Sequence, residues 1–102
     1  MASRSESFRA KVRIDPSNLL FQFSFGQALA EEGKEEEAVG PLSLCVEKKT
    51  DWMVPRILLG KCLLRIGEVA SAASILNEAL ALAKSQGHEE PESEIRDLLS
   101  DI

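Results

Sequence analysis

Apolar residues recur every three or four positions along most of the chain, in segments separated by short polar breaks. This spacing places them on one face of an α-helix. The pattern predicts six helices, at about residues 3–13, 19–32, 35–48, 53–66, 69–85 and 91–101. Pro55 falls in the first turn of its helix, whereas Pro41 lies well inside the third helix and predicts a kink there. The expected fold class is all-α.

An internal repeat of 34 residues relates positions 17–50 to positions 51–84. In each copy a glycine and an alanine permit close packing of two helices, and a second glycine fits the left-handed turn between them. Leucines at fixed offsets are expected to fill the core. The identical pairs are Gly26 with Gly60, Leu29 with Leu63, Gly33 with Gly67, Ala38 with Ala72, and Leu42 with Leu76.

The order of these residues resembles the tetratricopeptide repeat, which runs Trp-x2-Leu-Gly-x2-Tyr, then Ala-x3-Phe and a closing Pro. Gln22 and Arg56 stand at the position of the Trp. The resemblance covers residues 15–85 and implies antiparallel helical hairpins stacked as a short right-handed α-solenoid. A single domain spanning 1–102 is expected, with full repeats at 17–50 and 51–84.

The segments that flank the repeats are expected to cover the two ends of the stack. Residues 3–13, with Phe8 and Val12 one turn apart, take the place of the second helix of a missing preceding repeat. Residues 91–102 form an amphipathic capping helix, because solenoids need a polar-backed terminal element for solubility. Its apolar residues are Ile95, Leu98, Leu99 and Ile102.

The charge of the chain is acidic overall and unevenly distributed. A net charge of −5 argues against nucleic-acid binding, which needs a basic surface. Residues 1–14 carry a net +3 and residues 86–102 a net −5, so the two ends either attract each other, within one molecule or between two, or simply face solvent. The carboxylates of the acidic run at 31–37 are expected to splay into solvent around a turn.

No pattern in the sequence predicts catalysis or a cofactor. Cys45 and Cys62 lack CxxC spacing and are expected to be reduced and buried, and His88 is the single imidazole. A nucleotide-binding enzyme or regulator would need a phosphate-cradling loop, and none is recognisable. The chain lacks a run of about eighteen apolar residues and a secretion signal, so we expect a cytoplasmic protein that does not insert into membranes.

The family resemblance implies that a partner binds the concave face lined by the first helix of each repeat. Most of the residues carried over to that face are apolar, and they suit the apolar side of a helix or an extended peptide. Alternatively, some of them belong to the core and are covered by the end helices. These residues are Leu20, Phe23, Gln27, Ala30 and Glu31 in the first repeat, and Val54, Ile57, Lys61, Leu64 and Arg65 in the second.

Family members that bind the C-terminal carboxylate of chaperones carry a Lys, Asn and Arg clamp on this face, drawn from three repeats. Here Phe23 and Ile57 occupy the lysine-type positions, so the resemblance does not extend to that role. Trp52, between the repeats, either anchors a partner or packs as a plug. The predicted function is a protein-interaction module. The alternative is a homodimer formed through the first helix, since about three repeats are usually needed for a stable stack.

Overall fold

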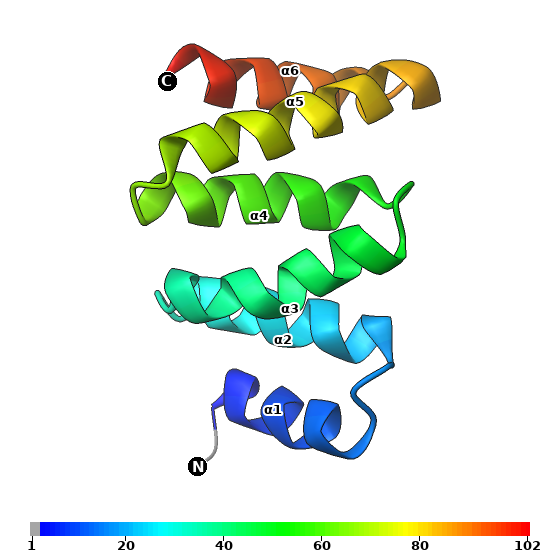
Figure 1. Ribbon diagram of the computed structural model, residues 1–102, viewed down its shortest axis with the longest axis vertical. Coiled ribbons are helices and arrows are strands. Elements are labelled where there is room, and N and C mark those ends of the chain that lie inside the picture. Colours follow the sequence, from blue (N-terminus) through cyan, green and yellow to red (C-terminus); the bar gives the residue numbers. More distant parts are fainter. Residues whose placement is uncertain (1–2) are drawn as a thin grey trace.

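The structure, a computed structural model that describes residues 3–102, is a stack of helices (Figure 1). Each helix packs against the next one in the chain, so α1 and α6 lie at opposite ends of a body measuring 38 × 26 × 20 Å. The all-α prediction is confirmed, and every helix bound lies within two residues of its predicted position. The helices are α1 (Arg4–Ile14), α2 (Leu19–Glu31), α3 (Glu35–Lys48), α4 (Met53–Arg65), α5 (Val69–Gln86) and α6 (Glu89–Ser100).

The same turn joins the two helices of each repeat. Gly33 has a φ of 77° and Gly67 a φ of 84°, the left-handed conformation that the sequence predicted. The residue after each glycine donates its backbone N–H to a leucine carbonyl five positions earlier, at 2.8 Å in both repeats. This is the Schellman arrangement, which satisfies a carbonyl at the helix end. The turn glycines therefore set where α3 and α5 begin.

The close approach within each hairpin involves a leucine side chain. A Cβ placed on Gly26 would lie 2.8 Å from Leu42 Cγ, and one placed on Gly60 would lie 2.5 Å from Leu76 Cδ2. Both distances are shorter than normal carbon contacts. The two glycines are required because the leucines of α3 and α5 fill the space that a side chain on α2 or α4 would occupy.

Polar residues take over the position where the family pattern has Trp. Gln22 and Arg56 are both buried, and each donates a side-chain hydrogen bond to the backbone carbonyl six residues earlier, that of Pro16 at 2.8 Å and that of Thr50. Arg56 also contacts the carboxylate of Glu78 at 3.3 Å. In each repeat this side chain ties the start of the first helix to the turn that precedes it.

Helix α3 continues through Pro41 from Glu35 to Lys48. Proline disfavours a helical conformation in the preceding residue because its ring crowds that residue's Cβ. Gly40 has no Cβ, so part of this conflict is removed. The kink at Pro41 stays a prediction.

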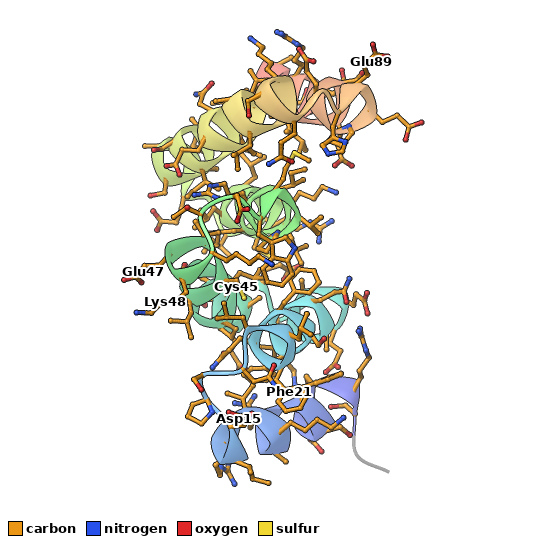
Figure 2. The ribbon with its side chains drawn as sticks, turned by 90° about the vertical axis from the view of Figure 1, so that its right-hand side faces the viewer. Asp15, Phe21, Cys45, Glu47, Lys48 and Glu89 are labelled. Atoms are coloured by element: carbon orange, nitrogen blue, oxygen red, sulfur yellow. The ribbon has the colours of Figure 1, made fainter. Side chains whose placement is uncertain are left out.

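The interior is built mainly from aliphatic side chains, with the leucines of the repeat at its centre. Leu29, Leu42 and Leu76 are fully buried. Both cysteines are also buried with free thiols, as predicted, and burial raises the pKa of the Cys45 thiol to about 11. Figure 2 shows Cys45 on the inner side of α3, with Glu47 and Lys48 projecting outward from the same helix.

The two terminal helices lie at opposite ends of the stack and pack against α2 and α5. Phe8 and Val12 of α1 pack against the core of the first repeat, and Ile95 of α6 is fully buried against the second. The helix α6 begins at Glu89, so Pro91 is its third residue rather than its first. Ile102, expected on the apolar face of this helix, lies beyond its end and is 49% exposed.

Candidate binding groove

A hollow of about 330 Å³ lies where α2, α4 and α6 come together, and we call it the central hollow. It brings together five residues of the face expected from the sequence and three others. The expected ones are Phe23, Gln27, Val54, Ile57 and Lys61, and the others are Leu58, Pro91 and Glu94. The groove is therefore formed by both repeats and by the C-terminal helix.

The walls of the central hollow are mostly apolar and are supported from within. Val54 is 51% exposed, whereas Phe23 is half-buried and Ile57 is 8% exposed. The Phe23 ring packs against Trp52 with 5.1 Å between ring centroids, and the Lys49 ammonium lies 5.4 Å from the Trp52 ring. Trp52 is half-buried and supports one side of Phe23. Val54 is the most accessible apolar side chain in the hollow.

Other residues of the expected face lie elsewhere. Leu20 is 69% exposed on α2, outside the lining of the hollow. Ala30 and Ile57 are buried in the core, although Ile57 also lines the hollow, and Leu64 is half-buried against the core. The alternative that some of the expected residues belong to the core therefore holds for Ala30 and Ile57. The two charged residues form ion pairs with other helices. Glu31 pairs with Arg4 of α1 at 2.7 Å, and Arg65 pairs with Glu35 of α3 at 3.5 Å.

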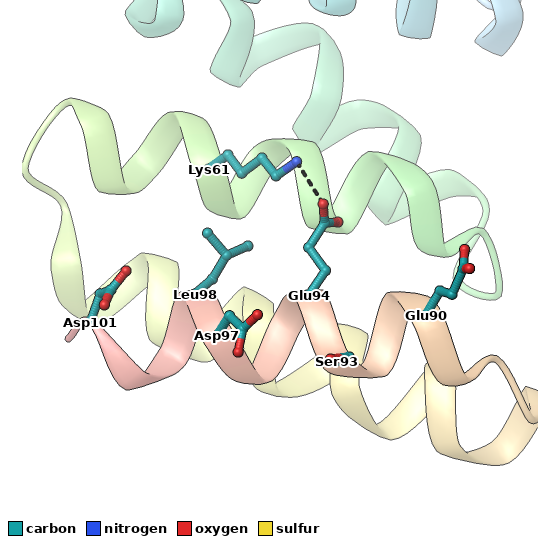
Figure 3. A pocket seen from close by; sticks show the side chains of 7 residues that line it. All are labelled: Lys61, Glu90, Ser93, Glu94, Asp97, Leu98 and Asp101. Carbon is teal, nitrogen blue, oxygen red and sulfur yellow. Dashed lines mark hydrogen bonds and ion pairs between the residues drawn. The ribbon is translucent and has the colours of Figure 1, made fainter.

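A second hollow of about 480 Å³ lies between α4 and α6, and we call it the acidic hollow (Figure 3). Lys61 and Glu94 line both hollows, and they form an ion pair of 3.2 Å across the boundary between them. The remaining lining comes from α6 and the residue that caps its C-terminal end: Glu90, Ser93, Asp97, Leu98 and Asp101. The two hollows are therefore neighbouring parts of one groove.

The carboxylates of the acidic hollow follow a helical spacing. Glu90, Glu94, Asp97 and Asp101 stand at i, i+4, i+7 and i+11, which places them along one side of α6. The same spacing is visible in the sequence. Which way the carboxylates face depends on how α6 docks.

The acidic run at 31–37 is mostly exposed around the turn, as expected, but several of its carboxylates also bind residues of α1. Glu31 pairs with Arg4 and Glu37 with Arg9, at 2.7 and 3.1 Å. Glu32 accepts a hydrogen bond from Ser5 Oγ at 2.6 Å and another from the Ser5 backbone N–H at 2.9 Å. These bonds lower the pKa of the Glu32 carboxyl. The run therefore forms the docking surface for α1.

The basic N-terminal segment pairs with the first repeat and not with the acidic C-terminal segment. Arg4 of α1 contacts Glu31 at the end of α2, and Arg9 contacts Glu37 in the first turn of α3. Figure 1 places α6 at the far end of the stack from α1. Attraction between the two ends within one molecule is thereby excluded for the described residues.

Residues 3–102 contain neither a membrane-spanning helix nor a cluster of metal-binding side chains. The described helices include none that is both long and apolar enough to cross a membrane. In the same part of the chain, no three His, Cys, Asp or Glu side chains are grouped so that they could hold a metal ion.

No family model matches the chain. The chain is nevertheless 31% identical over 78 residues to the TPR repeat-containing protein PA0015 of Pseudomonas aeruginosa. The matched segment covers 76% of this chain and 74% of that protein. The chain belongs to the tetratricopeptide-repeat family. The family resemblance found in the sequence is thus confirmed.

Solved structures of tetratricopeptide-repeat type share the fold. The protein BPP2914 from Bordetella parapertussis is 26% identical, with 99% of this chain and 88% of that one covered and a TM-score of 0.82. PcrH, from Pseudomonas aeruginosa, is 21% identical in its complex with the chaperone binding region of PopD, with 95% and 74% covered and a TM-score of 0.85. At this identity the likeness to PcrH concerns the fold.

Proposed function

We propose that this tetratricopeptide-repeat protein is an interaction module that holds an apolar segment of a partner protein in the central hollow. Its action is binding rather than catalysis. The observation that carries the proposal is the exposed Val54 between the apolar walls of Phe23 and Ile57. An apolar side chain of a partner placed there would remove apolar surface from water on both sides.

The shape of the hollow and the behaviour of a relative support this proposal. Shallow grooves that join two or three helices suit a helix or an extended peptide better than a small compact ligand. PcrH, whose fold this chain shares, is known in complex with the chaperone binding region of PopD. By analogy, the partner contributes a segment of its chain and not a folded domain surface.

The test is a pair of matched substitutions. Val54→Glu places a charge in the central hollow, whereas Val69→Glu places one at a similarly exposed valine on α5, outside the groove: the two side chains are 51% and 45% exposed. Each variant and the wild type are used to capture partners from the native cell, and the captured protein is then titrated. We expect Val54→Glu to weaken binding at least about tenfold, because a charge buried against apolar surface is unfavourable.

For this result to count, Val69→Glu must bind the partner as the wild type does, and both variants must keep the fold. Circular dichroism of both variants should match the wild type, because both sites are exposed. If Val54→Glu binds the captured partner as tightly as Val69→Glu does, the central hollow is not the binding site.

Self-association through α1 is the second candidate, and the side chain of Ile14 favours it because it is 85% exposed at the end of that helix. Light scattering of the wild type and of Ile14→Glu decides the matter. A wild-type dimer that becomes a monomer in the variant supports self-association. A wild-type monomer at high protein concentration excludes it.

A further inference from the structure

We infer that the partner segment is amphipathic and cationic, with apolar side chains in the central hollow and Lys or Arg side chains toward the carboxylates of α6. This inference rests on the proposed function and adds the chemical class of the ligand.

The two hollows are close enough to be occupied by one segment. Lys61 and Glu94 line both, so a ligand that extends from Val54 along α6 passes directly from apolar to acidic walls. Leu98 provides an apolar contact within the acidic hollow. A segment bound along this path therefore needs apolar groups where it contacts the central hollow and Leu98. It needs polar groups where it faces the carboxylates of α6.

The charge of the α6 wall is largely uncompensated. Glu94 pairs with Lys61, but Glu90, Asp97 and Asp101 have no basic partner among the ion pairs of residues 3–102. The one basic residue of α6, Arg96, pairs with Glu92 at 2.9 Å. Carboxylates held beside an apolar groove attract a cationic ligand and disfavour an acidic one.

The spacing of the carboxylates matches a segment of moderate length. From Glu90 to Asp101 the row spans about 16 Å, from the rise of 1.5 Å per helical residue. Basic residues three or four positions apart on a partner helix recur at the same interval, since residues at this spacing share one helical face. Chain segments of about three helical turns are therefore long enough to reach both hollows.

A second copy of this chain is a poor match for the groove. Four of its twelve basic residues lie in residues 1–14, where Arg4 and Arg9 already pair with Glu31 and Glu37 of their own molecule and the Lys11 ammonium lies 4.8 Å from the Phe8 ring. Of this segment, a second copy could offer Arg13 alone without breaking such a contact. The cationic segment therefore comes from a different protein.

The test uses three synthetic amphipathic peptides with the same apolar residues, whose polar positions are all Lys, all Gln or all Glu. Their binding is measured by fluorescence anisotropy in low salt and again in high salt. We expect the Lys peptide to bind about tenfold more tightly than the Gln peptide, and the Glu peptide to bind most weakly. Most of this difference should disappear in high salt, because the carboxylates are exposed.

Two triple variants test which carboxylates are responsible. In the variant E90Q/D97N/D101N the Lys peptide should bind only as tightly as the Gln peptide does. The control variant E36Q/E47Q/E68Q removes the same number of charges from exposed positions outside the groove and should leave the preference unchanged. Equal loss of preference in both triple variants would overturn the inference, because net charge alone would then explain it.

The remaining outcomes separate this inference from the proposed function. Equal binding of the Lys and Gln peptides, both abolished by Val54→Glu, overturns the cationic inference and leaves the apolar groove in place. Lys-peptide binding that Val54→Glu does not weaken also overturns it, because the central hollow would then be uninvolved. Failure of the proposed function appears in a different experiment, as unchanged capture of the native partner by Val54→Glu.

Discussion

The two terminal helices cover opposite ends of the stack by different means. The helix α1 has Ser5 as its one fully buried residue. Besides the contacts of Phe8 and Val12 with the core, it is held by ion pairs of Arg4 and Arg9 and by the hydrogen bonds between Ser5 and Glu32. The helix α6 is held by the fully buried Ile95, and most of its groove carboxylates have no basic partner. The charges of α1 attach it to the protein, whereas those of α6 remain available to a ligand.

The largest effect should come from the apolar anchor of α6. Ile95→Ala should lower the free energy of unfolding by about 2–5 kcal/mol, because it leaves a cavity where a fully buried side chain had packed. Ile102→Ala, at a 49% exposed site beyond the helix, should change it by less than about 0.5 kcal/mol. Chemical denaturation of the two variants measures the difference, and equal losses would mean that α6 is not held in this way.

Acid should loosen α1 before it loosens α6. The folded state lowers the pKa of Glu32, so its hydrogen bonds from Ser5 stabilise the fold above the ordinary carboxyl pKa and are lost as the pH falls through the lowered value. Hydrogen exchange of backbone amides across this acid range measures the effect helix by helix. Simultaneous loss of protection in α1 and α6 would contradict the comparison.

High salt should also loosen α1, but by less than acid does. The pairs Arg4 with Glu31 and Arg9 with Glu37 are largely exposed, so each stabilises the docking of α1 by about 0.2–1 kcal/mol at low ionic strength. Screening in 1 M salt should remove most of that contribution. Exchange protection of α1 should fall with salt while that of α6 does not, and a fall confined to α6 would reverse the assignment.

The smallest effect should come from the groove carboxylates themselves. The variant E90Q/D97N/D101N should keep or slightly raise stability, by up to about 0.5 kcal/mol, since like charges at helical spacing repel each other. Thermal denaturation is the measurement. A clear loss of stability would show that these residues hold α6 in place and are not reserved for a ligand.

The hairpins were predictable because glycine, alanine and leucine act locally. Gly33 and Gly67 determine a turn whatever surrounds them, and Gly26 and Gly60 each face a leucine of the same hairpin. The pairing of α1 was not predictable, because Arg4 and Glu31 are 27 residues apart and meet only when both helices have a definite rotation.

The groove was predictable only in part, for the same reason. Phe23, Val54 and Ile57 follow from the repeat register, which places them on the first helix of each hairpin. The contribution of Pro91 and Glu94 depends on how α6 docks against α4, and the amphipathic spacing of α6 does not determine that geometry.

The most direct test of the central claim, that the groove between α2, α4 and α6 binds the partner, is to follow backbone amide resonances while the captured partner's segment is titrated in. Val54, Lys61 and Glu94 should shift most, whereas Arg4 and Val69 should not move. Shifts confined to α1 and α5, with the groove residues unchanged, would contradict the account.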